Sequence, residues 1–385
     1  MAKFFKLLAT KGLARAGIIS TPHGTINTPA FMPVGTKASV KSLSSQDLKT
    51  TGAQIILGNT YHLYLRPGDK NLKKLGGLHQ FMRWSGPILT DSGGFQVSSL
   101  GHFIDEKTQN KSHLKRAVID NKGATFYSHL DGTKHRLTPA KSIRIQANLG
   151  ADIIMAFDEA TPNKGKSYAR SSMNRTHRWL NQSIKAWQKL GRYQALFGII
   201  QGGNFRDLRR LSALYVASKD LPGVAIGGGS IGQDPDETHL NVSWVRDILP
   251  QDKPLYLMGV GVGPTHILRA IQTGADMFDC VAPTRLARMG YLYTGEFETK
   301  KGEWSYKSQF PKDRLNIANS RFRLDQKVID KACDCFTCSS DYSRAYLHHL
   351  FREKELLYYR LATLHNIRVI IRLTNLIRDS ILNTS

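Results

Sequence analysis

The chain has 385 residues, enough for one large domain with additions, since an α/β barrel alone takes about 250 residues. Its 54 Lys and Arg residues against 30 Asp and Glu residues give a formal net charge of +24, which favours a polyanionic partner such as a nucleic acid over a generally basic proteome or an organellar address. No apolar run reaches the roughly 18 residues that cross a membrane, and Phe4–Ala9 is too short and interrupted for a signal peptide, so we expect a cytoplasmic protein with no membrane partner.

Eight short apolar runs, each followed by small and polar residues and then by a helical stretch, dominate the chain. They occupy residues 29–36, 54–60, 87–94, 151–159, 195–203, 223–228 and 255–261, and the last is the run that contains Asp279. Continuous apolar runs are typical of strands buried on both faces, and helices between them indicate parallel pairing. We therefore predict an α/β fold, a closed (β/α)8 TIM barrel whose active site lies at the carboxyl ends of its strands.

Helix start signals support this reading. Ser44 or Ser45 is a candidate cap for a helix over residues 46–50, and Thr138 followed by Pro139 predicts a helix through Gln146. Residues 168–190 have apolar positions spaced for one buried face, with arginines and lysines on the rest. Those charges indicate a solvated face rather than a groove reader.

Two parts of the chain depart from the barrel pattern. The Lys-rich segment near residues 98–125 predicts an excursion or a lid over the barrel mouth. After residue 290 the pattern changes to a hairpin over residues 291–306 and to helices from residue 341 to the end. We therefore divide the chain into a catalytic barrel, residues 1–290, and a C-terminal zinc-binding subdomain, residues 291–385, packed on it.

The cysteines indicate a metal site. Cys333, Cys335 and Cys338 are too close in sequence for a disulfide framework, and three thiolates suit a tetrahedral zinc ion that needs a fourth ligand. The downstream candidates are His348, His349 and His365, and the spacing does not choose between them. The remaining cysteine, Cys280, has apolar neighbours, and we expect it to be buried.

Polar groups follow the predicted strands. Asp91 opens the string Asp-Ser-Gly-Gly-Phe-Gln, in which paired glycines allow close approach of a ligand and Phe95 offers a ring for stacking. The other strand-end groups are the acid pair Asp158 and Glu159, Gln201-Gly202-Gly203, Gly227–Ser230, and Asp279 with Arg285 and Arg288. Each alone could be a turn; together they suit a planar base with donors and acceptors on its edge.

These strings resemble the tRNA-guanine transglycosylases of bacterial type, the queuine tRNA-ribosyltransferase family. The resemblance rests on residues 91–96, 155–159, 198–203, 256–261 and 278–285 and on the cysteine cluster with residues 342–347, and it covers nearly the whole chain. It implies that guanine at the wobble position of tRNAs with G-U-N anticodons (Asp, Asn, His and Tyr) is exchanged for a 7-deazaguanine base. The exchange would be a double displacement through a covalent tRNA-enzyme intermediate.

The resemblance also implies roles for individual residues. Asp279 looks like the nucleophile and Asp91 like the general acid/base. Asp158 would accept hydrogen bonds from the edge of the base, and Ser92, Gln201 and the Gly228 N–H would make the remaining polar contacts to that edge. The glycines beside Ser92 would allow the base to approach closely, and Phe95 and Met258 would lie on the two faces of its ring. The base-binding set is Ser92, Gly93, Gly94, Phe95, Asp158, Gln201, Gly228 and Met258.

The resemblance further implies that tRNA contacts two segments, Val260, Gly261, Val262, Gly263, Pro264, Thr265 and His266, and Thr284, Arg285, Leu286, Ala287 and Arg288. It assigns the fourth ligand of one structural Zn²⁺ ion per subunit to His365, giving the set Cys333, Cys335, Cys338 and His365. It also implies a homodimer that forms through the zinc subdomain.

Departures from the bacterial pattern concern the pocket. Ala160 stands where bacterial members usually have cysteine, and residues 229–233 differ from the bacterial string, with Gln233 in place of a glutamate. A pocket widened toward queuine and neutral drift around 7-aminomethyl-7-deazaguanine are both compatible with these changes. Two other functions are weighed against the enzyme: a non-catalytic tRNA-binding partner subunit, which the presence of both Asp91 and Asp279 opposes, and an unrelated barrel hydrolase with an accessory zinc.

Overall fold

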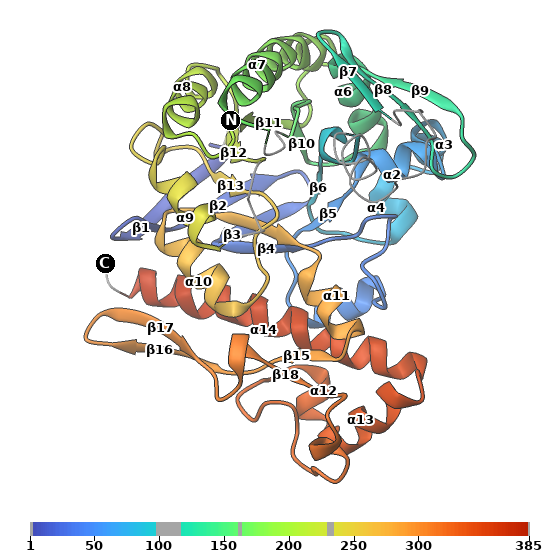
Figure 1. Ribbon diagram of the computed structural model, residues 1–385, viewed down its shortest axis with the longest axis vertical. Coiled ribbons are helices and arrows are strands. Elements are labelled where there is room, and N and C mark those ends of the chain that lie inside the picture. The colour runs from blue at the N-terminus through green and yellow to red at the C-terminus, as the bar shows by residue number, and fades with distance from the viewer. Residues whose placement is uncertain (1–2, 98–116, 161–163, 229–234, 384–385) are drawn as a thin grey trace.

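The computed structural model describes residues 3–97, 117–160, 164–228 and 235–383, and its centre is an eight-stranded parallel sheet (Figure 1). The strands are β4 (Ala30–Pro33), β5 (Ile56–Gly58), β6 (Ile88–Thr90), β10 (Ile153–Met155), β11 (Ala195–Ile200), β12 (Gly223–Ile226), β13 (Leu255–Leu257) and β14 (Met277–Cys280). They lie in the order β4-β14-β13-β12-β11-β10-β6-β5. A parallel bridge between Val34 and Leu57 joins the two ends of this order, so the sheet closes. Each predicted run contains one of these strands, and the predicted barrel is confirmed.

The inside of the barrel is filled by alternate side chains of the strands, because successive residues of a strand point to opposite faces. Met32, Leu89, Met155, Phe197 and Met277 belong to one buried cluster, in which all five are completely or almost completely inaccessible to solvent. The barrel is therefore a packed core, and chemistry can take place only at its ends.

A three-stranded antiparallel sheet that the sequence analysis did not predict closes the amino end of the barrel. It consists of β1 (Phe5–Lys11), β2 (Ala14–Thr21) and β3 (Gly24–Thr28). Phe5, Ile19 and Ile26 of this sheet join the interior cluster of the barrel. Burial alternates along β1 and β3, and the mostly buried β2 between them is interrupted by Arg15, so none of the three has the continuous apolar run that marked the barrel strands.

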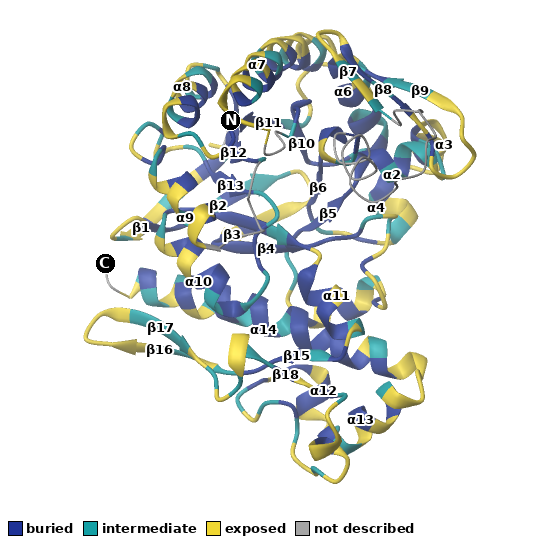
Figure 2. Ribbon diagram, viewed as in Figure 1, coloured by how far each residue is buried: buried dark blue, intermediate teal, exposed yellow. Residues whose placement is uncertain are grey.

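Helices form the outer layer, as the buried inner and exposed outer faces in Figure 2 show. In chain order they are α1 (Ser45–Thr50), α2 (Thr60–Leu65), α3 (Asp69–Lys74), α4 (Gly77–Met82), α6 (Pro139–Leu149), α7 (Lys166–Lys189), α8 (Arg206–Ala217), α9 (Pro235–Ser243), α10 (Pro264–Gln272) and α11 (Ala282–Arg288). Ser44 caps α1 in a capping box with Asp47, and Thr138 caps α6. Both start signals are confirmed, and α6 runs one turn further than predicted.

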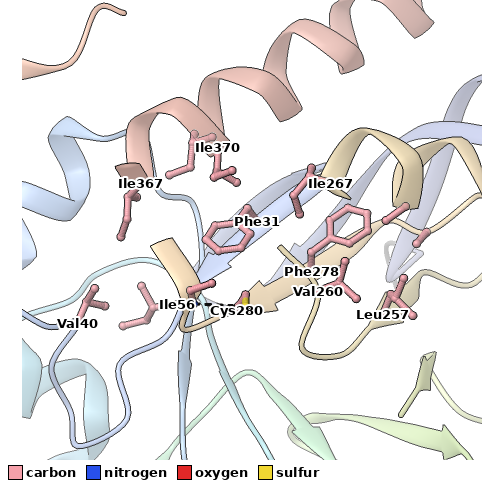
Figure 3. Close-up of a cluster of buried hydrophobic side chains, with 14 of the residues drawn as sticks. Phe31, Val40, Ile56, Leu257, Val260, Ile267, Phe278, Cys280, Ile367 and Ile370 are labelled. Carbon is pink, nitrogen blue, oxygen red and sulfur yellow. Dashed lines mark hydrogen bonds between the residues drawn. The ribbon is translucent and has the colours of Figure 1, made fainter. Parts of the chain in front are cut away.

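From residue 291 to residue 383 the structure has three α-helices, two short 3-10 helices (Pro311–Asp313 and Ser320–Phe322) and two small sheets. The α-helices are α12 (Phe336–Ser339), α13 (Arg344–Arg352) and α14 (Leu356–Leu382), and α14 contacts β1, β2, β4, α10 and α11. Figure 3 shows Ile370 of α14 over Phe31 of β4, with Ile367 of α14 on one side of the ring and Ile267 of α10 on the other. The longest helix of the described residues is thus also part of the outer layer of the barrel, which explains why so much of it is buried in Figure 2.

Two predictions for irregular parts need comment. Residues 98–116 of the predicted excursion lie outside the described residues, and residues 117–125 belong to β7 (Ala117–Asp120) and β8 (Gly123–Tyr127), which form a sheet with β9 (Lys134–Leu137). The hairpin predicted over residues 291–306 is wrong at its start: β15 (Tyr291–Tyr293) pairs with the distant β18 (Arg314–Asn316). The hairpin is formed by β16 (Glu296–Lys300) and β17 (Glu303–Lys307).

None of the described helices combines the length and the apolar character that a membrane crossing requires.

Candidate active site

Asp279 is the last but one residue of β14, at the carboxyl end of the barrel. The Tyr256 hydroxyl donates to its Oδ1 atom at 2.6 Å, and the backbone N–H of Gly259 donates to the same oxygen at 2.7 Å. Burial raises the pKa of the Asp279 carboxyl, the Gly259 and Tyr256 donors lower it in part, and the neighbouring Asp91 carboxylate raises it again. The carboxylate is thus held by one oxygen and has no cation among these partners.

Asp91 follows β6 and lies beside the end of β5. Its Oδ2 atom accepts from the Asn59 side chain at 2.6 Å and from the Gln96 side chain at 2.8 Å, while Oδ1 accepts from the Thr60 N–H at 2.7 Å. Burial raises the pKa of Asp91 by more than these donors lower it. A carboxyl group with a raised pKa can carry a proton closer to neutral pH, as a general acid must.

Asp158 follows β10 and is joined to two other predicted site residues. The Ser92 hydroxyl donates to its Oδ1 atom and the Gln201 amide donates to its Oδ2 atom, each at 2.8 Å. Burial raises the pKa of Asp158 to about 6, although Ser92 and Gln201 lower it, and the charge of Asp91 adds to the increase. The structure therefore brings together Asp91, Ser92, Asp158, Gln201 and Asp279 from four strands.

Two glycines of the site are required by close contacts. A Cβ atom on Gly228, which has a φ of +76°, would lie 1.9 Å from the Gln201 side-chain oxygen. A Cβ atom on Gly94 would lie 2.1 Å from the carbonyl oxygen of Asp158. Neither site loop can therefore accept a larger residue without moving Gln201 or Asp158.

A buried arginine holds two of these loops in place from behind. Arg209 of α8 is completely buried and donates to the carbonyl oxygens of Gly203 and Gly227 at 2.7 Å, and to that of Gly228 at 3.3 Å. Burial lowers the pKa of its guanidinium to about 9. Arg209 was not among the predicted site residues, because a single arginine in an amphipathic helix gives no signal of this role.

Three predicted residues lie outside the hydrogen-bonded group of Asp91, Ser92, Asp158, Gln201 and Asp279. Phe95 is 59% exposed, so its ring is accessible to a ligand rather than part of the core. Met258 is half-buried and packs on the barrel interior cluster. Of the acid pair, Glu159 points away from the site, because Arg175 and the Tyr168 hydroxyl of α7 bind its carboxylate.

The predicted tRNA-binding segments lie beside β14 and β13. Arg285 is exposed and Arg288 is half-buried at the end of α11, where Arg288 donates to the Thr284 carbonyl oxygen at 2.9 Å. Val260 and Ala287 are completely buried, so their side chains face the core. Within these segments the exposed arginine and the half-buried Val262, Gly263, Thr265 and Arg288 are the parts that solvent reaches.

The three cysteines meet His365 in a buried cluster. Its ligand atoms all lie within 4.8 Å of one another, and the Nδ1 atom of His365 is 3.4 Å from the sulfurs of Cys335 and of Cys338. The other ring nitrogen, Nε2, donates to the Tyr293 carbonyl oxygen at 2.7 Å, a partner typical of ligating histidines. His348 binds the Ile317 carbonyl oxygen and His349 is exposed, so the cluster fits a Cys3His metal site that uses His365.

Comparison with known proteins gives the same family as the strings of residues. A family model described as Queuine tRNA-ribosyltransferase matches residues 10–385. The chain belongs to this family. Members named queuine tRNA-ribosyltransferase include those of Herpetosiphon aurantiacus, 50% identical over 379 residues (98% of this chain and 88% of that protein), and of Caldanaerobacter subterraneus, 48% identical over 369 residues (96% and 90%). The protein of that name from Thermus thermophilus is 46% identical over 378 residues (98% and 90%).

Family membership confirms the resemblance and the enzyme class, since the family is one of pentosyltransferases. The sequence analysis nevertheless missed the residues that bind the carboxylates, Asn59, Thr60 and Tyr256. All three lie in runs that were predicted as strands, within or directly after the strand. Because parallel strands end at one edge, that position was the available signal.

Proposed function

We propose that this protein is a tRNA-guanine transglycosylase that exchanges guanine at the wobble position of G-U-N anticodons for a 7-deazaguanine base. The observation that carries the proposal is the arrangement of Asp91, Asp158 and Asp279 at one barrel mouth. Burial raises the pKa of all three carboxyl groups, and the charge of Asp91 further raises the pKa of Asp158 and of Asp279. Membership in the queuine tRNA-ribosyltransferase family supports it. This exchange would form part of queuosine biosynthesis or salvage.

In the first displacement Asp279 attacks the anomeric carbon of the wobble ribose. Both donors reach Oδ1, so Oδ2 is the oxygen that forms the new C–O bond. The bond from that carbon to the guanine nitrogen breaks, and Asp91 gives a proton to the departing base. The product is a covalent ester between tRNA and Asp279, as in retaining glycosidases.

The second displacement reverses these roles. Asp91, now ionised, takes the ring proton of the incoming 7-deazaguanine base, whose nitrogen attacks the same carbon. The ester bond breaks, and the Tyr256 hydroxyl and the Gly259 N–H stabilise the carboxylate that leaves. Two inversions return the ribose to its original configuration.

Asp158 would select the base. Its ionised carboxylate can accept from a ring N–H and the adjacent amino group of guanine, a pair of donors that adenine does not present. Ser92 and Gln201 already hold this carboxylate, and the Gly228 N–H would complete the polar edge. Phe95, which is exposed, and Met258 would cover the two faces of the ring.

We infer that the Cys3His cluster binds one structural Zn²⁺ ion. Three thiolates and an imidazole are a common zinc donor set, and such an ion supplies cross-linking of the chain rather than chemistry. Here Cys333, Cys335 and Cys338 would be fixed to α14 through His365. The zinc subdomain also carries exposed apolar residues, Phe336, Tyr346 and Leu356, which support a homodimer contact in a cytoplasmic enzyme.

The alternative function, a non-catalytic tRNA-binding partner subunit, is less well supported. Such a subunit needs no nucleophile, whereas here Asp279 is held by two donors with one oxygen directed by neither of them. Asp91 is likewise held by three donors in a position that affects the pKa of Asp279.

The test is release of labelled guanine from the wobble position of a G-U-N tRNA. It is run with queuine and, in parallel, with 7-aminomethyl-7-deazaguanine. Wild-type protein should release guanine with at least one base, and Asp279→Ala should not. The matched control is Asp247→Ala, which removes an exposed carboxylate paired with Arg210 and should keep full activity.

The outcomes separate the open points. Release with queuine alone would support a pocket widened at Ala160, and release with the aminomethyl base alone would assign that departure to neutral drift. Residues 229–233, the other departure, lie outside the described residues. No release with either base, or equal activity of Asp279→Ala and wild type, would contradict the proposed function.

A further inference from the structure

A cavity of about 310 Å³ lies between β15, β18 and the loop that precedes β18. Two aromatic rings, Tyr291 and Phe310, and three cationic side chains, Lys312, Arg314 and Arg321, line it. Lys312 and Arg321 are exposed and Arg314 is half-buried, so solvent reaches all three charges. The zinc subdomain therefore has a basic cavity that the proposed chemistry at the barrel mouth does not use.

The two arginines of this cavity lie over aromatic rings instead of pairing with carboxylates. The Arg314 guanidinium lies 5.1 Å from the centre of the Tyr291 ring, and that of Arg321 lies 5.1 Å from the Phe310 ring and 4.7 Å from the Phe322 ring. Across the described ranges, the ion pairs of this subdomain involve other residues, and none joins Lys312, Arg314 or Arg321 to an acid. A guanidinium on a ring face keeps its N–H edge available for an anion.

The loop that carries Lys312 is tied to the proposed tRNA-binding surface. Asp313 accepts from the Thr265 N–H through its side chain at 3.1 Å and from the Thr294 N–H through its carbonyl oxygen at 2.9 Å. The Tyr293 hydroxyl donates to the Val262 carbonyl oxygen at 2.8 Å. The cavity is therefore fixed to the segment 260–266, and Figure 1 shows β15 directly beside α11, the helix of the two exposed or half-buried arginines.

The backbone of this loop also points to a built feature. Lys312 and Asp313 have φ values of 57° and 58°, in the left-handed region that residues other than glycine rarely adopt. The two bonds of Asp313 hold the chain in this conformation and leave the Lys312 side chain exposed at the cavity. Strained backbone retained by specific bonds is frequent at ligand sites.

A second cavity, of about 460 Å³, shows what a less suitable basic surface looks like. It is lined by Tyr64, Lys70, Lys141 and Arg144, among others. The Lys141 ammonium already donates to the Tyr64 hydroxyl at 2.8 Å and to the Arg136 carbonyl oxygen at 2.9 Å. The Lys141 ammonium is therefore held by acceptors within the protein. Among the described residues, no side-chain hydrogen bond or ion pair holds Lys312, Arg314 or Arg321 in this way.

We propose that the cavity of Tyr291, Phe310, Lys312, Arg314 and Arg321 binds a backbone phosphate of the tRNA substrate, away from the wobble nucleotide. This inference rests on the proposed function, because that function makes tRNA the substrate. A phosphate fits better than a base, since the guanidinium groups of Arg314 and Arg321 already lie over the rings on which a base would stack. Phosphate contacts fix the position of a nucleic acid and carry no sequence information.

The test measures tRNA affinity as a function of salt for a triple variant, Lys312→Gln, Arg314→Gln and Arg321→Gln. Its control, Lys70→Gln, Lys74→Gln and Arg144→Gln, removes the same number of positive charges from exposed residues at the side of the barrel. We expect the slope of log K against log salt to fall by about one for the cavity variant, since one lost phosphate contact removes about 0.7–0.9. The control should keep the wild-type slope.

Kinetics give a second readout. With saturating tRNA the cavity variant should keep the wild-type kcat, while its KM for tRNA rises by about tenfold or more. If the triple variant does not fold, as judged by its circular dichroism, the exposed Lys312→Gln alone should lower the slope in the same direction, by at most about one. A slope and KM equal to those of the control would overturn the proposal.

Comparing full-length tRNA with an isolated anticodon-loop RNA shows where the bound phosphate lies. Guanine exchange by the wild-type protein tests the proposed function separately from the phosphate site. If the phosphate lies in the stem, an isolated anticodon-loop RNA should bind the cavity variant and wild type equally. If it lies in the loop, both substrates should show the loss. Wild-type protein that exchanges no guanine would contradict the proposed function; exchange by wild type with an unaffected cavity variant would overturn the phosphate site alone.

Discussion

The aspartates at the two ends of the barrel have different kinds of hydrogen-bond partner. At the amino end Asp276, three residues before Asp279 on the same strand region, is bound by the Arg15 guanidinium, and Asp152 is bound by His23 and His79. At the carboxyl end Asp279 and Asp158 are held by neutral donors. The same residue type therefore serves stability where a cationic or titratable partner faces it, and is available for chemistry where none of its hydrogen-bond partners is charged.

The pKa values of Asp152 and Asp158 shift in opposite directions, although at the amino end burial also raises the pKa of Asp276 despite its bonds to Arg15. Burial raises the pKa of Asp152, but the bonds from His79, His23 and the Ile88 N–H outweigh it, so the net shift is downward. Burial raises the pKa of Asp158 to about 6. A lowered carboxyl pKa contributes stability above the unfolded value of 3.8, which is lost as pH falls. A raised one costs stability as pH rises from 3.8 to about 6.

The largest effect should come from Asp279→Asn. The amide cannot form the ester, so exchange should fall on the order of 10⁴-fold or more, as for the loss of other enzymatic nucleophiles. Thermal stability should be unchanged or higher, because an uncompensated buried carboxylate is removed. Single-turnover guanine release and calorimetry measure the two quantities. A large loss of stability would show that Asp279 is structural.

Asp276→Asn should have the opposite effects, with stability lost and the exchange activity kept. It leaves the Arg15 guanidinium buried without its carboxylate partner, which costs about 3–5 kcal/mol of the free energy of unfolding. The exchange rate per folded molecule should stay near that of wild type. Urea unfolding measures the loss, with Asp247→Asn as the exposed control, for which we expect a much smaller loss because solvent screens its ion pair with Arg210. Equal effects of the two variants would contradict the contrast between the barrel ends.

Tyr256→Phe should have a smaller effect at the mouth. It removes one donor from Asp279 Oδ1 and leaves the Gly259 N–H in place. A hydrogen bond to a charged group contributes about 1.5–3 kcal/mol, so kcat should fall by about 10- to 100-fold. The affinity for tRNA should not change. Tyr293→Phe, which loses a bond to the Val262 carbonyl oxygen, is the matched control and should keep the wild-type kcat.

The smallest effect concerns pH. If base binding needs the ionised Asp158, kcat/KM for the base should fall as pH decreases through about 6. Asp158→Asn should lose this acid limb together with most of the affinity. In unfolding experiments at pH 8 the same variant should be more stable than wild type, because the folded protein no longer holds a carboxylate whose ionisation burial disfavours. An acid limb that persists in Asp158→Asn belongs to another group.

Sequence prediction was accurate where the signal is local. The strands of the barrel are continuous apolar runs, and a parallel sheet places all their carboxyl ends at one edge, so Asp91, Asp158 and Asp279 could be assigned to one mouth. The caps at Ser44 and Thr138 depend on residues within the same turn and were also predicted. The antiparallel strands β1 to β3 gave no comparable run, because β1 and β3 alternate in burial and the buried β2 is interrupted by Arg15.

By itself, therefore, the sequence determined the barrel, the order of the strand-end groups and the cluster of three cysteines. The choice of His365 beside the cysteines came from the family resemblance, and the structure agrees with it. Only the tertiary structure decided the other neighbours: Tyr256 on Asp279, Glu159 turned toward α7, and β15 paired with β18. The physical reason is that periodicity and capping depend on a few consecutive residues. Hydrogen-bond partners are set by contacts between segments far apart in the chain, which no local pattern encodes.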